Sequence, residues 1–83
     1  MSENTSLRFS IRRLHVATYA DSFTVWVYRD REARLDDVIV PGFFNEAGEW
    51  FNVGDWIMVS ASDGGRILVV IQAGDAVRTS GLS

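Results

Sequence analysis

The segment that decides the fold is GFFNEAGEWFNVGDWIMV, residues 42–59 of the 83-residue chain. It contains two of the three tryptophans, three of the five phenylalanines and three of the seven glycines. Its Val53-Gly54-Asp55 turn leads directly into an apolar run that starts at Trp56. Because glycine adopts turn conformations that other residues resist, the segment predicts an aromatic loop, a tight turn and then a strand.

The clearest pair of strands follows this turn. Trp56–Ala61 and Ile67–Gln72 are rich in the β-branched and apolar residues that strands favour. The residues between them, 62–66, read Ser-Asp-Gly-Gly-Arg. Asp-Gly and Gly-Gly steps are typical of tight β-turns, so we predict a hairpin here.

The N-terminal part predicts two further strands. Residues 7–11 alternate apolar and polar side chains, as a half-buried strand does. The alternation slips at residues 12–13, where a bulge or bend would restore it. Residues 19–22 indicate a turn, and Phe23–Tyr28 is dense in β-branched and aromatic residues.

The connection between the two halves is polar. Residues 29–34 are charged, and residues 35–39 place apolar side chains at the spacing of a short helix that Pro41-Gly42 would end. A strand at residues 38–40 fits nearly as well. Residues 45–49 indicate a polar loop.

These segments together predict a mainly β fold, a small antiparallel β-sandwich or barrel with at most one short helix. We expect a flexible N-terminus at residues 1–6 and a single β domain at residues 7–78, which ends in a short strand at residues 76–78. A frayed tail would follow at residues 79–83.

Apolar side chains occupy both faces of the predicted strands. One set forms the core, and a second set of large side chains also needs cover: Trp26, Tyr28, Trp56, Met58, Leu68 and Val70. Full burial of each is worth roughly 1.5–3 kcal/mol. Either a two-layer sandwich or barrel hides both sets internally, or the second set forms an oligomer or docking surface.

The composition limits the class of protein. A net charge of −3, 47% hydrophobic residues and no cysteine exclude a disordered chain, disulfides and thiolate metal sites. Nothing in these totals favours non-specific binding to nucleic acid or anionic membranes. The longest apolar run, residues 67–71, is far short of a membrane span, so we expect a soluble protein made in the cytoplasm.

The charge is unevenly distributed along the chain. Residues 1–34 contain six arginines and four acidic residues, whereas residues 35–83 contain two arginines and seven acidic residues. Packing of identical chains would therefore bring unlike halves together.

No group of residues suggests catalysis. His15 is the only histidine, and it lacks the convergent ligands of a metal site and the nucleophile of a triad. The acids at residues 36–37 suit the first turn of a helix. The turn at residues 62–66 lacks the ligands of a phosphate or calcium loop, and Glu46 and Glu49 have no partner base. We expect no catalytic residue, cofactor or metal, and therefore no enzyme.

A small β-barrel that binds single-stranded nucleic acid is a less favoured alternative. Side chains that would stack on bases or contact phosphates are present: Trp26, Tyr28, Trp56, Arg8, Arg12 and Arg13. The acidic net charge and the absence of lysine argue against this function.

The central segment resembles a recurrent motif in small structural proteins of tailed bacteriophages. In that motif an aspartate-containing turn and a brief helix precede Gly-aromatic-Phe-Asn, an acidic or alanine-rich loop, an aliphatic-x-Val-Gly-Asp turn and an apolar strand. The matching residues here are 35–38, 42–45, 46–49 and 51–59. Pro41 departs from the motif, which has a small residue at that position.

The resemblance implies a head decoration (cement) protein, a homo-oligomer and commonly a trimer. Such a protein binds the major capsid protein on the outer surface of the virion and stabilises the shell without catalysis. A tail or fibre-associated virion protein is the alternative, and neither a membrane nor nucleic acid is an expected partner. Chosen by their chemistry, the candidate interface residues are Arg8, Arg12, Arg13, Trp26, Tyr28, Phe43, Phe44, Trp50, Trp56 and Met58.

Overall fold

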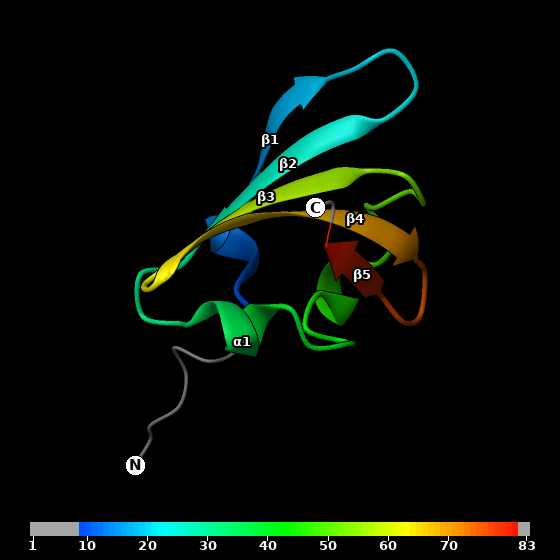
Figure 1. Ribbon diagram of the computed structural model, residues 1–83. Coiled ribbons are helices and arrows are strands. Elements are labelled where there is room, and N and C mark those ends of the chain that lie inside the picture. The colour runs from blue at the N-terminus through cyan, green and yellow to red at the C-terminus, as the bar shows by residue number, and fades with distance from the viewer. Residues whose placement is uncertain (1–8, 82–83) are drawn as a thin grey trace.

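A single mixed sheet of five strands dominates the structure (Figure 1). The computed structural model describes residues 9–81. The strands, which lie side by side in this order, are β1 (Leu14–Tyr19), β2 (Thr24–Arg29), β3 (Trp56–Ala61), β4 (Gly64–Gln72) and β5 (Arg78–Gly81). The helical elements are α1 (Leu35–Val38) and the 3-10 turns η2 (Ile11–Arg13) and η3 (Asn45–Ala47). The predicted mainly β fold with one short helix is confirmed.

One neighbouring pair of strands is parallel. β2 and β3 run in the same direction, whereas β1–β2, β3–β4 and β4–β5 are antiparallel. Parallel neighbours need a long crossover connection, and residues 30–55 form it. The sheet is therefore mixed rather than wholly antiparallel, and its layer of strands packs on a layer of loop and short helices.

The crossover covers one side of the sheet. Figure 1 shows α1 and the loop that contains η3 on this same side. At the start of α1, the Leu35 backbone N–H donates a hydrogen bond to Asp63 Oδ1 in the β3–β4 turn at 2.9 Å. The Arg34 N–H donates to Asp37 Oδ2 at 3.0 Å. These carboxylates satisfy amides near the start of the helix, and the structure has the predicted helix here instead of the alternative strand.

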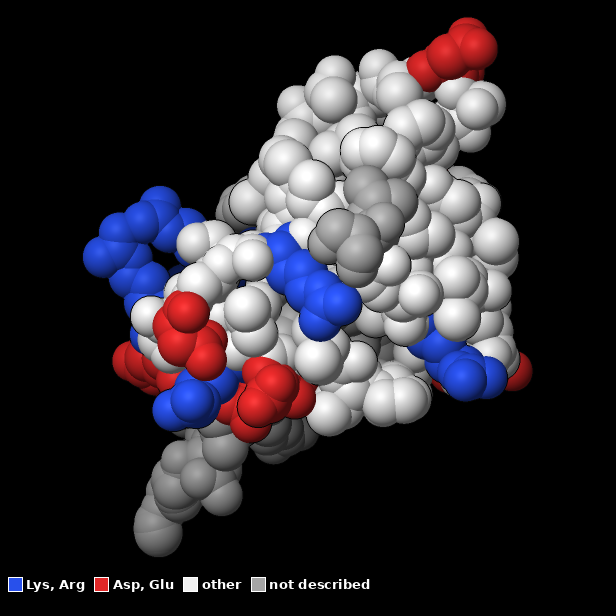
Figure 2. Space-filling model, in the orientation of Figure 1, with Lys and Arg blue, Asp and Glu red and all other residues white. Residues whose placement is uncertain are grey.

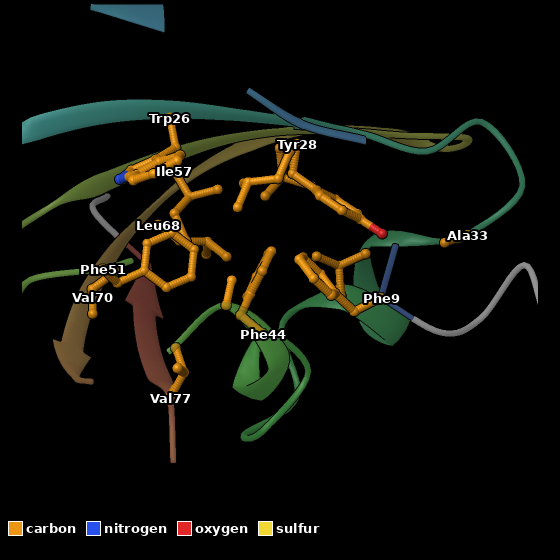
Figure 3. Close-up of a cluster of buried hydrophobic side chains, with 14 residues drawn as sticks. Phe9, Trp26, Tyr28, Ala33, Phe44, Phe51, Ile57, Leu68, Val70 and Val77 are labelled. Carbon is orange, nitrogen blue, oxygen red and sulfur yellow. The ribbon is translucent and has the colours of Figure 1, made fainter. Parts of the chain in front are cut away.

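The core lies between the sheet and this crossover (Figure 3). Tyr28 of β2 meets Phe44 of the crossover edge-to-face, with ring centroids 5.3 Å apart. Trp26 meets Phe51 in the same way at 5.2 Å. Phe9 stacks on Tyr28 at 5.4 Å. Edge-to-face and offset pairs are favoured arrangements of aromatic rings, so the aromatic central segment supplies much of the layer that covers the sheet.

A buried carboxylate joins the Val-Gly-Asp turn to β2. Asp55 is 1% exposed, and its Oδ1 accepts a hydrogen bond from the Thr24 N–H at 3.0 Å. Its Oδ2 accepts from Trp26 Nε1 at 3.1 Å and from the Asn52 N–H at 3.0 Å. Because Thr24 begins β2 and Asp55 precedes β3, these bonds help to fix the register of the parallel pair.

The predictions for the two ends of the domain need correction. Residues 9–10 have no regular structure and residues 11–13 form η2, so the predicted strand at residues 7–11 is absent from its described part. Phe9 instead packs into the aromatic core. At the other end, pairing with β4 orders residues 78–81 as β5, so the strand begins later than the predicted residues 76–78 and includes residues 79–81, where a frayed tail was expected. The predictions for residues 1–8 and 82–83 lie outside the described residues.

Candidate functional site

The side of the sheet opposite the core is a second apolar surface. Side chains alternate between the two faces of a strand, so residues next to the buried Trp26, Ile57 and Leu68 project to the other side. We call this surface the open face and define it by six apolar residues: Val25, Val27, Trp56, Met58, Ile67 and Val69. In Figure 1, neither α1 nor the loop with η3 lies over it.

The residues of the open face are cross-strand neighbours. Val25, Trp56 and Val69 form one row across β2, β3 and β4. The next row consists of Val27, Met58 and Ile67. Directly paired residues on one face of a sheet lie close enough to contact each other, so the six side chains form one contiguous patch.

Much of this patch remains accessible to water. Met58 is 38% exposed and Ile67 is 37% exposed, whereas the other four residues are partly buried. Phe23 packs on Trp56 with ring centroids 5.2 Å apart and extends the patch at one end. Removing apolar surface from water is favourable by about 25 cal/mol per Å², so the open face provides a driving force for association.

Polar side chains flank the patch on several sides. On the flanking strands, His15 and Thr18 of β1 pair with Val27 and Val25, and Ser80 of β5 pairs with Val69. Arg29 and Ser60 form the next row along β2 and β3. Figure 2 shows charged side chains gathered around the lower left of the molecule, whereas the upper part, over β1–β3, is mostly uncharged. An apolar centre with a polar rim is the usual anatomy of a protein interface.

Three predicted interface residues belong to the core instead. Trp26, Tyr28 and Phe44 are 8%, 0% and 1% exposed. Their prediction as contact residues is wrong, because the protein's own sheet and crossover enclose them. Trp56 and Met58, by contrast, lie on the open face as a contact surface requires.

The other two predicted aromatic residues lie in the crossover. Phe43 is partly buried and packs edge-to-face on Phe44 at 5.1 Å, so it mainly completes the core. Trp50 is 55% exposed in the loop that precedes β3. Only Trp50 of this pair presents a large free surface.

The predicted basic contact residues also differ in their surroundings. Arg12 is exposed, whereas Arg13 places Nε 3.8 Å from Oδ1 of the buried Asp30. Arg8 lies outside the described residues. A cleft lined by Ser10, Arg12 and Arg13 contains no nucleophile paired with a base.

Four open-face residues were not among the predicted contact residues: Val25, Val27, Ile67 and Val69. Trp26 and Tyr28 were predicted to share a face with Trp56 and Met58, but the register pairs Trp26 with Ile57. A shift of one residue in register moves every side chain of a strand to the other face. The apolar character of both faces was visible in the sequence, but the pairing that separates them was not.

Buried polar groups near η2 have a structural role. Asp30 Oδ1 accepts hydrogen bonds from the Glu32 and Ala33 N–H groups at 2.9 and 3.2 Å, which shapes the turn after β2. Its Oδ2 is buried without a hydrogen-bond partner among the described residues.

The Tyr28 hydroxyl is a second buried polar group. Burial raises its pKa above 10.0, and the Ser10 N–H, which donates a hydrogen bond to the hydroxyl oxygen at 3.0 Å, partly opposes this rise.

The described residues contain no alternative site of obvious chemistry. Within residues 9–81, no three His, Asp or Glu side chains converge as metal ligands would. None of the helices in this range is long and apolar enough to cross a membrane. The open face is therefore the strongest candidate for a functional surface in this part of the chain.

Comparisons with family models, curated proteins and solved structures find no match to this chain.

Proposed function

We propose that this protein is a non-catalytic structural protein of a bacteriophage virion, a head decoration protein that binds the major capsid protein as a homo-oligomer. The observation that carries the proposal is the open face, where Met58 and Ile67 remain more than one-third exposed at the centre of the sheet. The resemblance of residues 42–59 to phage structural proteins gives the class of assembly.

The size of the chain supports a role in an assembly. A domain of about this length buries only roughly 60–65% of the surface that its unfolded form exposes. The chain has no cysteine with which to form a disulfide, so association is the available source of additional stability. Many copies on one shell would also gain from avidity, because each attached oligomer raises the effective concentration of its remaining binding sites.

Quantitative mass spectrometry of purified virions tests the proposal. We expect this chain in copy numbers comparable to those of the major capsid protein, and we expect heads that lack it to lose their contents at lower temperature. Adding the purified protein back to such heads would restore their resistance. Absence of the chain from purified virions would overturn the proposal, and its presence only on tails in labelled electron micrographs would favour the tail-associated alternative.

A further inference from the structure

The two ends of the sheet carry unlike charges. At the end where β2 finishes, Arg12, Arg29 and Arg31 are exposed. At the opposite end, the β1–β2 turn and the β4–β5 connection present the exposed acids Asp21 and Asp75. Within residues 9–81, neither Arg29 nor Asp21 forms an ion pair. The exceptions to this polarity are Glu32, Asp36 and Asp63 at the first end, where Asp63 Oδ2 lies 3.6 Å from Arg34 Nη2, and Arg78 at the second.

We propose that a second copy of this chain covers the open face, with the strands of the two stacked sheets antiparallel. The inference rests on the proposed function and specifies its homo-oligomer as a two-fold pair, in place of the trimer that the resemblance implies. Facing sheets pack about 10 Å apart, and in the aligned class the strand axes of the two sheets cross at an angle of about 30° or less. In this arrangement the Arg29 end of each copy lies over the Asp21 end of the other.

Self-association suits this surface because its centre carries no charge. The five strands contain no Asp or Glu, so stacking two copies buries no carboxylate, which would be costly without a partner. A two-fold interface brings the same patch of both chains together and must be self-complementary. A parallel stack would set the Arg29 ends against each other, whereas the antiparallel stack pairs unlike charges twice.

A charge at the centre of the patch tests whether this face is the interface. Met58→Glu introduces a carboxylate in the middle row, and we expect the dissociation constant of the pair to rise at least about a hundredfold in sedimentation experiments. The matched control is Val40→Glu, because Val40 is 46% exposed and follows α1 on the covered side of the sheet. Circular dichroism verifies that both variants keep the fold. Equal association of both variants and the native protein would overturn the proposal.

A charge exchange tests the orientation. Arg29→Glu and Asp21→Arg should each weaken the pair by about tenfold, since two symmetry-related contacts change from attraction to repulsion. The double variant should recover native affinity, and Glu46→Arg at an exposed position of η3 should have no effect. Failure of the double variant to recover would refute the antiparallel stack, and a trimeric native protein would refute the two-fold pair. Neither result would remove the protein from the virion, so the proposed function has its own separate test.

Discussion

Replacement of Asp55 by alanine is expected to destabilise the domain more than any surface substitution. The carboxylate is 1% exposed and accepts hydrogen bonds from the Thr24 N–H, Trp26 Nε1 and the Asn52 N–H. A buried donor left without a partner costs about 1–3 kcal/mol. Asn52 is exposed and its amide can bond to water instead, so we expect Asp55→Ala to reduce the free energy of unfolding by about 4 kcal/mol.

Urea unfolding followed by tryptophan fluorescence measures this loss. Asp55→Asn keeps the shape but replaces one acceptor oxygen by a donor group, so it should cost about 2 kcal/mol. Asp21→Ala, at an exposed turn position, is the control and should change stability by less than about 0.5 kcal/mol. The reasoning would be refuted if Asp55→Ala stayed within about 1 kcal/mol of the native protein.

Three further predictions concern other contacts. Tyr28→Phe removes the acceptor of the Ser10 N–H and should cost about 1 kcal/mol in urea unfolding at neutral pH. Burial raises the pKa of Tyr28, so the contribution of this hydroxyl to stability is complete below pH 10.0 and is lost as pH rises through the folded-state pKa; a titration of Tyr28→Phe should lack this loss. Gly48→Ala would place Cβ against the Gly74 carbonyl oxygen, so thermal unfolding should show that the free energy of unfolding falls by about 2–3 kcal/mol. A melting temperature equal to that of the native protein would contradict this close approach.

The local structure was largely predictable because nearby residues determine it. The Asp63–Gly65 steps favour a turn, and the hairpin of β3 and β4 forms there. Pro41-Gly42 prevents a longer helix, and α1 ends at Val38. Phe23–Tyr28 was recognisable as a strand from its β-branched and aromatic residues, and β2 spans Thr24–Arg29.

The relation between distant segments was not predictable in the same way. Alternation within β2 and β3 is compatible with either strand direction, and only the path of the crossover makes the pair parallel. The candidate site depends on that pairing, because it decides that Trp56 shares a face with Val25 and not with Trp26. Two of the hydrogen bonds to Asp55, from Trp26 Nε1 and the Thr24 N–H, likewise join residues 29 and 31 positions apart, which no local pattern reveals.

The most direct test of the central claim is the oxidation rate of the Met58 thioether by peroxide as a function of protein concentration. Met58 is 38% exposed on the open face of a single chain, and oxidation of methionine requires access to its sulfur. We predict that Met58 becomes protected as protein concentration rises, in step with the doubling of molecular mass, while a methionine peptide in the same solution reacts at a constant rate. An unchanged Met58 rate across the whole concentration range would contradict it.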